Sequence, residues 1–191
     1  MKHIRNIITG HGPDQAGAMA TKPVIRWAKA GDAEAIHHLL QALAESLGQH
    51  DKFSCTTADI SRFGLGEQPV FRALLAETDG TPVGLCLFFT SFSSWRGQPG
   101  IYVQDLYVAP AWRRSGLGQR LLGRAAAYGR QHGCTYLRLS VDSSNKSGRR
   151  FYHRLGFIWS RQERIQQLSD EAFTALAEAG SPLPQPGDSC S

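Results

Sequence analysis

Apolar residues recur along this chain at two spacings, and these predict an ordered series of strands and helices. Residues 24–27 have the character of a short strand, and Gly31-Asp32 that of a cap for the helix that follows. The buried stripe of this helix consists of five apolar residues at helical spacing: Ile36, Leu39, Leu40, Leu43 and Leu47. A second, shorter helix is predicted over residues 57–63.

Two runs of strand-forming residues, 70–77 and 83–90, are separated by Thr78-Asp79-Gly80-Thr81-Pro82. A glycine-containing turn between two such runs predicts an antiparallel hairpin. Residues 101–108 have the same character, and we expect them to pair next.

The period of the pattern then changes to that of a helix with one apolar stripe, formed by Leu117, Leu121, Leu122, Ala125 and Tyr128. Gly133 breaks the helix, and residues 136–141 alternate as in a strand. Strand, helix and strand in this order predict a crossover unit of a sheet.

Beyond the crossover, residues 145–155 predict a helix that ends at Gly156. Strands are predicted near 157–160 and 164–168, and Ser169 is placed to cap a last helix through residue 179. The order β-α-α-β-β-β-α-β-α-β-β predicts an α/β fold, with a mixed, twisted sheet flanked by helices. Residues 1–22 and 181–191 lack periodicity, so we expect disordered tails on a single domain over 23–180.

Composition adds little to this prediction of the fold. The 191 residues suffice for one domain with a sizeable core. The chain has no apolar run that could span a bilayer and no signal-peptide pattern, so we expect a cytoplasmic protein without a membrane partner. Its four cysteines lack the spacing that zinc requires, which predicts free thiols and no metal site.

The distribution of charge is more informative than the net charge of +5. Residues 113–164 hold 12 lysines and arginines against two acids, whereas residues 24–112 hold 6 against 9. The cationic half suits an anionic ligand, and the slightly acidic half suits a cationic one. Nucleic acid is the competing explanation, but no nucleic-acid module is recognisable, so we expect no such partner.

Residues 106–118 carry the strongest chemical signal: an apolar strand end, a proline, two arginines and small residues that open a helix. Gly116 and Gly118 let the backbone approach a ligand, and the first turn of the helix offers unpaired N–H groups. We therefore expect a cradle for a pyrophosphate. Because Gln119 follows Gly118, the match to a nucleotide P-loop is poor, and the spacing to Gly123 does not fit the dinucleotide fingerprint.

Arg113, Gly116 and Gly118 match the pattern [RQ]-x-x-G-x-[GA], and the stretch resembles the coenzyme-A-binding motif of the GCN5-related N-acetyltransferases. Asn145 and the later run Phe151-Tyr152-His153-Arg154-Leu155-Gly156-Phe157 match a second signature of this family, at the expected position. The chain resembles the diamine (spermidine/spermine) and thialysine-type members over residues of about 23–176. The resemblance implies the family's acyltransferase fold, acetyl-CoA as co-substrate, and a homodimer.

The resemblance also implies a coenzyme site. The backbone of Leu106, Tyr107 and Val108 would bind the pantetheine arm as an added strand, where a bulge opens a gap in the sheet. A backbone N–H near Val108 would stabilise the oxyanion. The other expected coenzyme-binding residues are Arg113, Arg114, Ser115, Gly116, Leu117, Gly118, Gln119, Asn145, Lys146, Ser147 and Gly148.

Acetyl transfer further requires a proton for the departing thiolate and an amine that has lost its proton. Tyr152 matches the tyrosine that family members use as general acid. Gln104 stands where relatives carry a glutamate, and it cannot accept a proton at neutral pH, which excludes a direct base at that position. Three roles are open for Asp105: it accepts the amine proton through water, it binds the ammonium group electrostatically, or it is a structural carboxylate. A water chain to solvent would also suffice to remove the amine proton.

Five residues are expected at the acceptor site: Trp95, Gln104, Asp105, Ser46 and Leu47. Ser46 and Ser93 replace a tyrosine and an aspartate of the polyamine enzymes, which weakens the case for a long polycation. We expect direct attack, in a ternary complex, by a primary amine of a small molecule: a diamine, a polyamine, a basic amino acid or a lysine analogue. The alternatives are a non-catalytic acetyl-CoA sensor and an enzyme that acetylates proteins or peptides.

Overall fold

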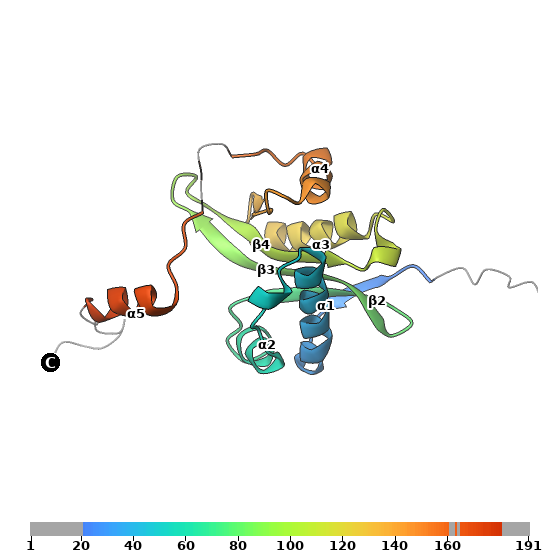
Figure 1. Ribbon diagram of the computed structural model, residues 1–191. Coiled ribbons are helices and arrows are strands. Elements are labelled where there is room, and N and C mark those ends of the chain that lie inside the picture. Colours follow the sequence, from blue (N-terminus) through green and yellow to red (C-terminus); the bar gives the residue numbers. More distant parts are fainter. Residues whose placement is uncertain (1–20, 161–162, 164, 181–191) are drawn as a thin grey trace, which may run out of the picture. The chain divides into compact units, whose positions relative to one another are not determined.

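The computed structural model describes residues 21–160, 163 and 165–180, and it divides into two compact units between Phe151 and Tyr152. The first unit is built on a five-stranded sheet with strand order β1-β2-β3-β4-β5 (Figure 1). Residues 1–20 and 181–191, where the tails were expected, lie outside the described residues.

The elements follow the predicted order through the crossover. The first unit contains β1 (Val24–Trp27), α1 (Ala33–Ser46), α2 (Thr57–Gly64), β2 (Arg72–Thr78), β3 (Thr81–Ser93), β4 (Gln98–Val108), α3 (Leu117–Gln131), β5 (Leu137–Leu139) and most of α4 (Lys146–Arg154). Short 3-10 turns are η1 (Ala30–Asp32), η2 (His50–Lys52) and η3 (Pro110–Trp112). The second unit contains the end of α4 and α5 (Asp170–Glu178).

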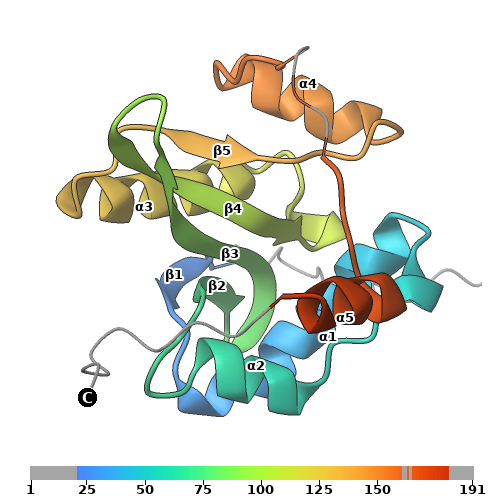
Figure 2. The ribbon, with the colours of Figure 1, turned by 90° about the vertical axis from the view of Figure 1, so that its left-hand side faces the viewer.

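The sheet is mixed, as predicted. The pairs β1–β2, β2–β3 and β3–β4 are antiparallel, and β5 pairs with β4 in parallel after the crossover helix α3 (Figure 2). The hairpin turns at Asp79 and Gly80, whose φ angles of 48° and 75° are those of a tight hairpin turn. The α/β fold class predicted from the sequence is confirmed.

The strand predicted over 157–160 is wrong, and residues 165–168 also form no strand; Arg164, the first residue of that prediction, lies outside the described residues. Ile158 is 95% exposed and Ile165 is 73% exposed. A strand forms only where a neighbour satisfies its main-chain groups, and a short apolar run does not reveal whether that neighbour exists.

Helices cover both faces of the sheet in the first unit. Ile36, Leu39 and Leu40 of α1 are buried against Leu75 and Leu85 on one face. On the other face lies α3 (Figure 1), where a Cβ at Gly84 would come within 3.2 Å of Leu121. The absence of a side chain at Gly84 therefore lets α3 pack closely on the sheet.

A charge cluster ties β1 to the start of α1. The guanidinium of Arg26 donates to both carboxylate oxygens of Asp32, at 2.6 and 2.8 Å, and also to the carboxylate of Glu77. Asp32 accepts the main-chain N–H of Lys29 as well, at 2.7 Å. The hydrogen bonds from Arg26 hold the pKa of Asp32 below its ordinary value.

Because its folded-state pKa is lowered, Asp32 contributes stability above the pKa of an unfolded Asp, and this contribution is lost as the pH falls through the folded pKa. We expect Asp32→Asn to reduce the free energy of unfolding at pH 7 by about 2 kcal/mol, because it disrupts a largely buried pair. Urea unfolding at several pH values should show the difference shrinking below about pH 4. Asp79→Asn, at the exposed turn, is the control; an equal loss there would contradict this account.

Candidate functional site

The edge of β4 that faces β5 is open over half of its length. β5 pairs with β4 only from Ile101 to Val103, so no strand in the described ranges covers this edge from Gln104 onward. The N–H of Ala109 donates to the Val83 carbonyl at 2.9 Å. Because main-chain groups alternate along an antiparallel ladder, those of Leu106 and Val108 point away from β3, toward the open edge.

A β-bulge stands at the start of this open edge. Leu87 pairs with Asp105 but Phe88 pairs with Val103, which leaves Gln104 without a counterpart on β3. The extra residue reverses the alternation of side chains. Ile101 therefore packs against Gly129 of α3, whereas Tyr107 belongs to the core cluster beneath α1. The bulge thus turns Asp105 toward the α1 face.

The open edge leads into a turn that exposes the N-terminus of α3. Gly116, at the cap position, has a φ of 83°, a left-handed conformation that favours glycine. The first N–H bonded to the preceding turn is that of Arg120, which reaches the Gly116 carbonyl. The N–H groups of Leu117, Gly118 and Gln119 therefore lack intrahelical acceptors and can bind an anion.

The residues between η3 and α3 hold this turn in place. The Arg113 side chain donates from Nε to the Val108 carbonyl at 3.0 Å, and the Ser115 hydroxyl donates to the Trp112 carbonyl at 2.6 Å. Arg114 is exposed and has a φ of 65°, a strained conformation for a residue other than glycine. Gly118 faces Phe151 and Val108, which a Cβ would approach to 3.3 and 3.7 Å.

The predicted residues at the start of α4 form its cap. The Asn145 side-chain oxygen accepts the N–H of Gly148 at 2.8 Å and the hydroxyl of Ser147 at 3.1 Å. A Cβ at Gly148 would lie 2.7 Å from the Asn145 amide, so a side chain here would displace the capping group. Lys146 is exposed.

The end of α4 fixes the main chain and the ring of Tyr152. The Phe157 N–H donates to the Tyr152 carbonyl at 3.1 Å, and the Gly156 N–H donates to the His153 carbonyl at 3.0 Å. With the φ of 88° at Gly156, these bonds form a Schellman motif, whose usual apolar contact is here the edge-on packing of the Tyr152 and Phe157 rings. The predicted stop at Gly156 is therefore confirmed.

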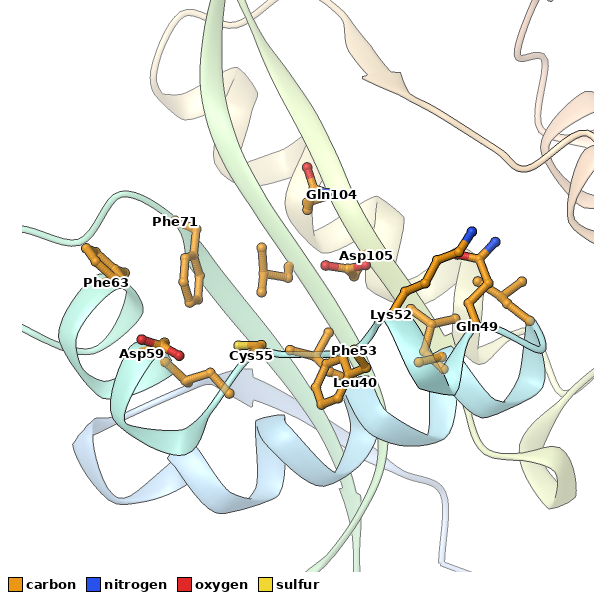
Figure 3. Close-up of a pocket in the computed structure, with 15 residues that line it drawn as sticks. Leu40, Gln49, Lys52, Phe53, Cys55, Asp59, Phe63, Phe71, Gln104 and Asp105 are labelled. Atoms are coloured by element: carbon orange, nitrogen blue, oxygen red, sulfur yellow. The ribbon is translucent and has the colours of Figure 1, made fainter. Parts of the chain in front are cut away.

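A cavity of about 420 Å³ lies on the α1 face beside the bulge (Figure 3). Its wall is mainly apolar, and its lining residues are Leu40, Leu43, Ala44, Leu47, Gln49, Lys52, Phe53, Cys55, Asp59, Ile60, Phe63, Phe71, Leu87, Gln104 and Asp105. In Figure 3 the Asp105 carboxylate lies between Lys52 and Gln49 at one end and Asp59 and Phe63 at the other. The size and the apolar wall suit a small organic molecule.

Asp105 is the acidic group of this cavity that awaits a partner. Burial raises its pKa to about 6, and no hydrogen bond or ion pair of its carboxylate is present among the described residues. Asp59 differs, because its carboxylate accepts the N–H and the hydroxyl of Thr56 at the cap of α2, which lowers its pKa. A cation that bound at Asp105 would therefore compensate the burial of its carboxylate.

The structure brings together three of the five expected acceptor residues, Leu47, Gln104 and Asp105. Ser46 is exposed and donates to the Leu43 carbonyl, and Trp95 is 99% exposed at the tip of the β3–β4 hairpin; neither lines the cavity. The sequence pattern did not indicate the wall formed by η2, α2 and the residues next to them, including Lys52, Phe53 after η2 and Phe71 before β2. Phe53 and Phe71 lie outside the apolar stripes of the predicted helices. Large apolar residues in such connecting segments were the signal that could have indicated this wall.

Known proteins share the sequence pattern and the fold of this chain. Residues 33–157 match the model of the acetyltransferase (GNAT) family. The chain is 35% identical to a thialysine N-epsilon-acetyltransferase of Bos taurus over 70% of this chain and 82% of that protein. It is 30% identical to a human spermidine/spermine N(1)-acetyltransferase-like protein, over 70% of this chain and 20% of that protein. An integron cassette protein of V. cholerae has a similar fold, with a TM-score of 0.70, 17% identity, and coverage of 83% and 99%.

Asp105 also has a consequence for stability. Since its folded-state pKa of about 6 lies above the unfolded value, the native state loses stability as the pH rises from 4 through 6. We expect Asp105→Asn to raise the free energy of unfolding at pH 8 by roughly 2 kcal/mol, because the buried carboxylate no longer ionises. Denaturant titrations of the ligand-free protein should show this gain disappearing near pH 4. Asp51→Asn, an exposed change on η2, should show no such gain; a loss of stability in Asp105→Asn at pH 8 would contradict the assignment.

Proposed function

The chain belongs to the acetyltransferase (GNAT) family of N-acetyltransferases, and from this premise we propose that it transfers the acetyl group of acetyl-CoA to a primary amine of a small molecule. The reaction proceeds by direct attack of the amine in a ternary complex. The observation that carries the proposal is the open edge of β4, which runs from the bulge at Gln104 into the exposed N-terminus of α3.

The residues present fit the coenzyme. An extended pantetheine arm carries amide groups that can pair with the main chain of Leu106 as a further strand would. The N–H groups of Leu117, Gly118 and Gln119 are placed for the pyrophosphate, and Arg114 adds positive charge. Acetyl-CoA supplies the activated acyl group as a thioester, and the main-chain N–H of Val108 is the candidate donor to the developing oxyanion.

Tyr152 is the proposed general acid, which donates its phenolic proton to the departing thiolate. Support comes from the family signature in which it stands and from the Schellman motif, whose contact with Phe157 restricts the ring. A ring restricted in this way keeps its phenolic oxygen near one position relative to the end of α4, which favours proton transfer.

Asp105 is proposed to bind the acceptor amine as an ammonium ion and to accept its proton through water. Gln104, next to it, can donate or accept hydrogen bonds but cannot take up the proton at neutral pH. The substrate is a diamine, a polyamine, a basic amino acid or a lysine analogue, in keeping with the names of the similar proteins. The family resemblance also underlies the expectations of a homodimer and a cytoplasmic location.

The coenzyme site is tested by Gly118→Val. A Cβ at Gly118 already approaches Phe151 and Val108, so two further methyl groups would displace the first turn of α3. We expect the Kd of coenzyme A, measured by calorimetry, to rise about tenfold or more. Gly123→Val is the matched control, because nothing lies within 4 Å of a Cβ on the same helix at Gly123. Equal affinity in the two folded variants would count against this site.

The catalytic step is tested by Tyr152→Phe. We expect kcat for release of coenzyme A, with a saturating amine, to fall roughly 100-fold or more, the usual contribution of a general acid, while the Kd of coenzyme A stays unchanged. Tyr102→Phe removes a hydroxyl that bonds Ser140 at 2.8 Å and should leave kcat almost unaffected. If the wild-type protein binds acetyl-CoA but acetylates no amine, it is a coenzyme sensor instead. Turnover with peptides alone would identify a protein-modifying enzyme.

A further inference from the structure

The acceptor cavity is lined by charged groups of opposite sign, Lys52, Asp59 and Asp105. The N–H and the hydroxyl of Thr56 both donate to Oδ2 of Asp59, whose carboxylate lies at the end of the cavity opposite Lys52 (Figure 3). Asp105 lies between the two, so an ammonium group bound there can direct the rest of its molecule toward Lys52.

Lys52 is exposed at the end of η2, and no hydrogen bond or ion pair of its ammonium group occurs in the part of the chain that the structure describes. The acid beside it, Asp142, is already engaged. Its carboxylate accepts the N–H and hydroxyl of Ser144, at 2.8 and 2.5 Å, and the side-chain amide of Gln49 at 3.2 Å. The hydrogen bonds from Ser144 are the main cause that lowers the pKa of Asp142, and the charge of Lys52 contributes least to it. The Lys52 ammonium group therefore keeps its hydrogen-bond donors for a ligand at the rim of the cavity.

Apolar side chains line the cavity between these two charges, among them Leu43, Leu47 and Phe53. A ligand complementary to this order has an ammonium group at Asp105, an aliphatic chain along the apolar wall, and an anion at Lys52. An acceptor that ended in a second ammonium group would bring two cations together at the rim, which is unfavourable.

Resting on the proposed function, we infer that Lys52 determines acceptor specificity by binding a carboxylate at the far end of the substrate. The acceptor class is then an amino acid or another aminocarboxylate, rather than a diamine or polyamine. Lys52 is a specificity residue that contacts the substrate but takes no part in the chemistry, so its effect depends on the far end of the acceptor.

Three acceptors that differ only in the charge of the far end can test the role of Lys52. Each has a primary amine on a five-carbon chain, and the far end is anionic in 6-aminohexanoate, neutral in 1-aminopentane and cationic in 1,5-diaminopentane. We expect kcat/KM of the wild-type protein to fall in this order. In Lys52→Gln, kcat/KM for 6-aminohexanoate should fall about fivefold, the size expected of a solvent-exposed ion pair, and that for 1-aminopentane should not change. Lys52→Glu should reverse the preference in favour of the diamine.

Lys22→Gln removes the same charge from an exposed position before β1 and should preserve the order of the three acceptors. If Lys52→Gln changes all three acceptors equally, or none, the inference is overturned while acetyl transfer stands. If no amine is acetylated, the proposed function fails instead. Calorimetric binding of the same three amines in the presence of coenzyme A then decides the role of Lys52: a preference for 6-aminohexanoate that Lys52→Gln abolishes supports it, and equal binding overturns it.

Discussion

A strand alternates its side chains between two faces only while its register with the next strand is unbroken, and in β4 the register breaks at Gln104. Before the break, Ile101 packs beneath α3; after it, Asp105 and Tyr107 face α1. The pairing with β5 also ends here, which frees main-chain groups downstream. One inserted residue therefore places a carboxylate in a cavity on one face and prepares the edge for an extended ligand.

The two halves of the site have opposite electrostatic requirements, and the fold meets them differently. At the N-terminus of α3, unpaired N–H groups and exposed arginines can remain in water until an anion binds, so they place little strain on the protein. Asp105 is instead partly buried without a partner, which raises its pKa and weakens the folded state at neutral pH. The cavity thus holds a destabilising charge that a bound cation would relieve, and this favours a cationic ligand there.

Features that depend on neighbouring residues were predictable from the sequence. The Asp79-Gly80 turn, the left-handed Gly116 and the end of α4 at Gly156 each follow from a few adjacent residues. The cavity was not predictable, because its wall combines α1, η2, α2, β3 and β4 with the segments between them, such as Phe71 before β2. The prediction of a strand over 157–160 failed for the same reason. The apolar residues of this segment are typical of a buried strand, but they do not show whether a neighbouring strand is present to pair with it.

This contrast explains why the reaction class is easier to predict from the sequence than the substrate. The second family signature forms a turn that depends on adjacent residues only: Gly156 ends α4, and Phe157 packs against the ring of Tyr152. Because this turn depends only on neighbouring residues, it can be read from the sequence together with the family that residues 33–157 match. The acceptor wall is assembled from distant segments and can change one side chain at a time. The acceptor therefore has to be inferred from the charges of the cavity rather than from the family, and in this chain those charges include the cation of Lys52.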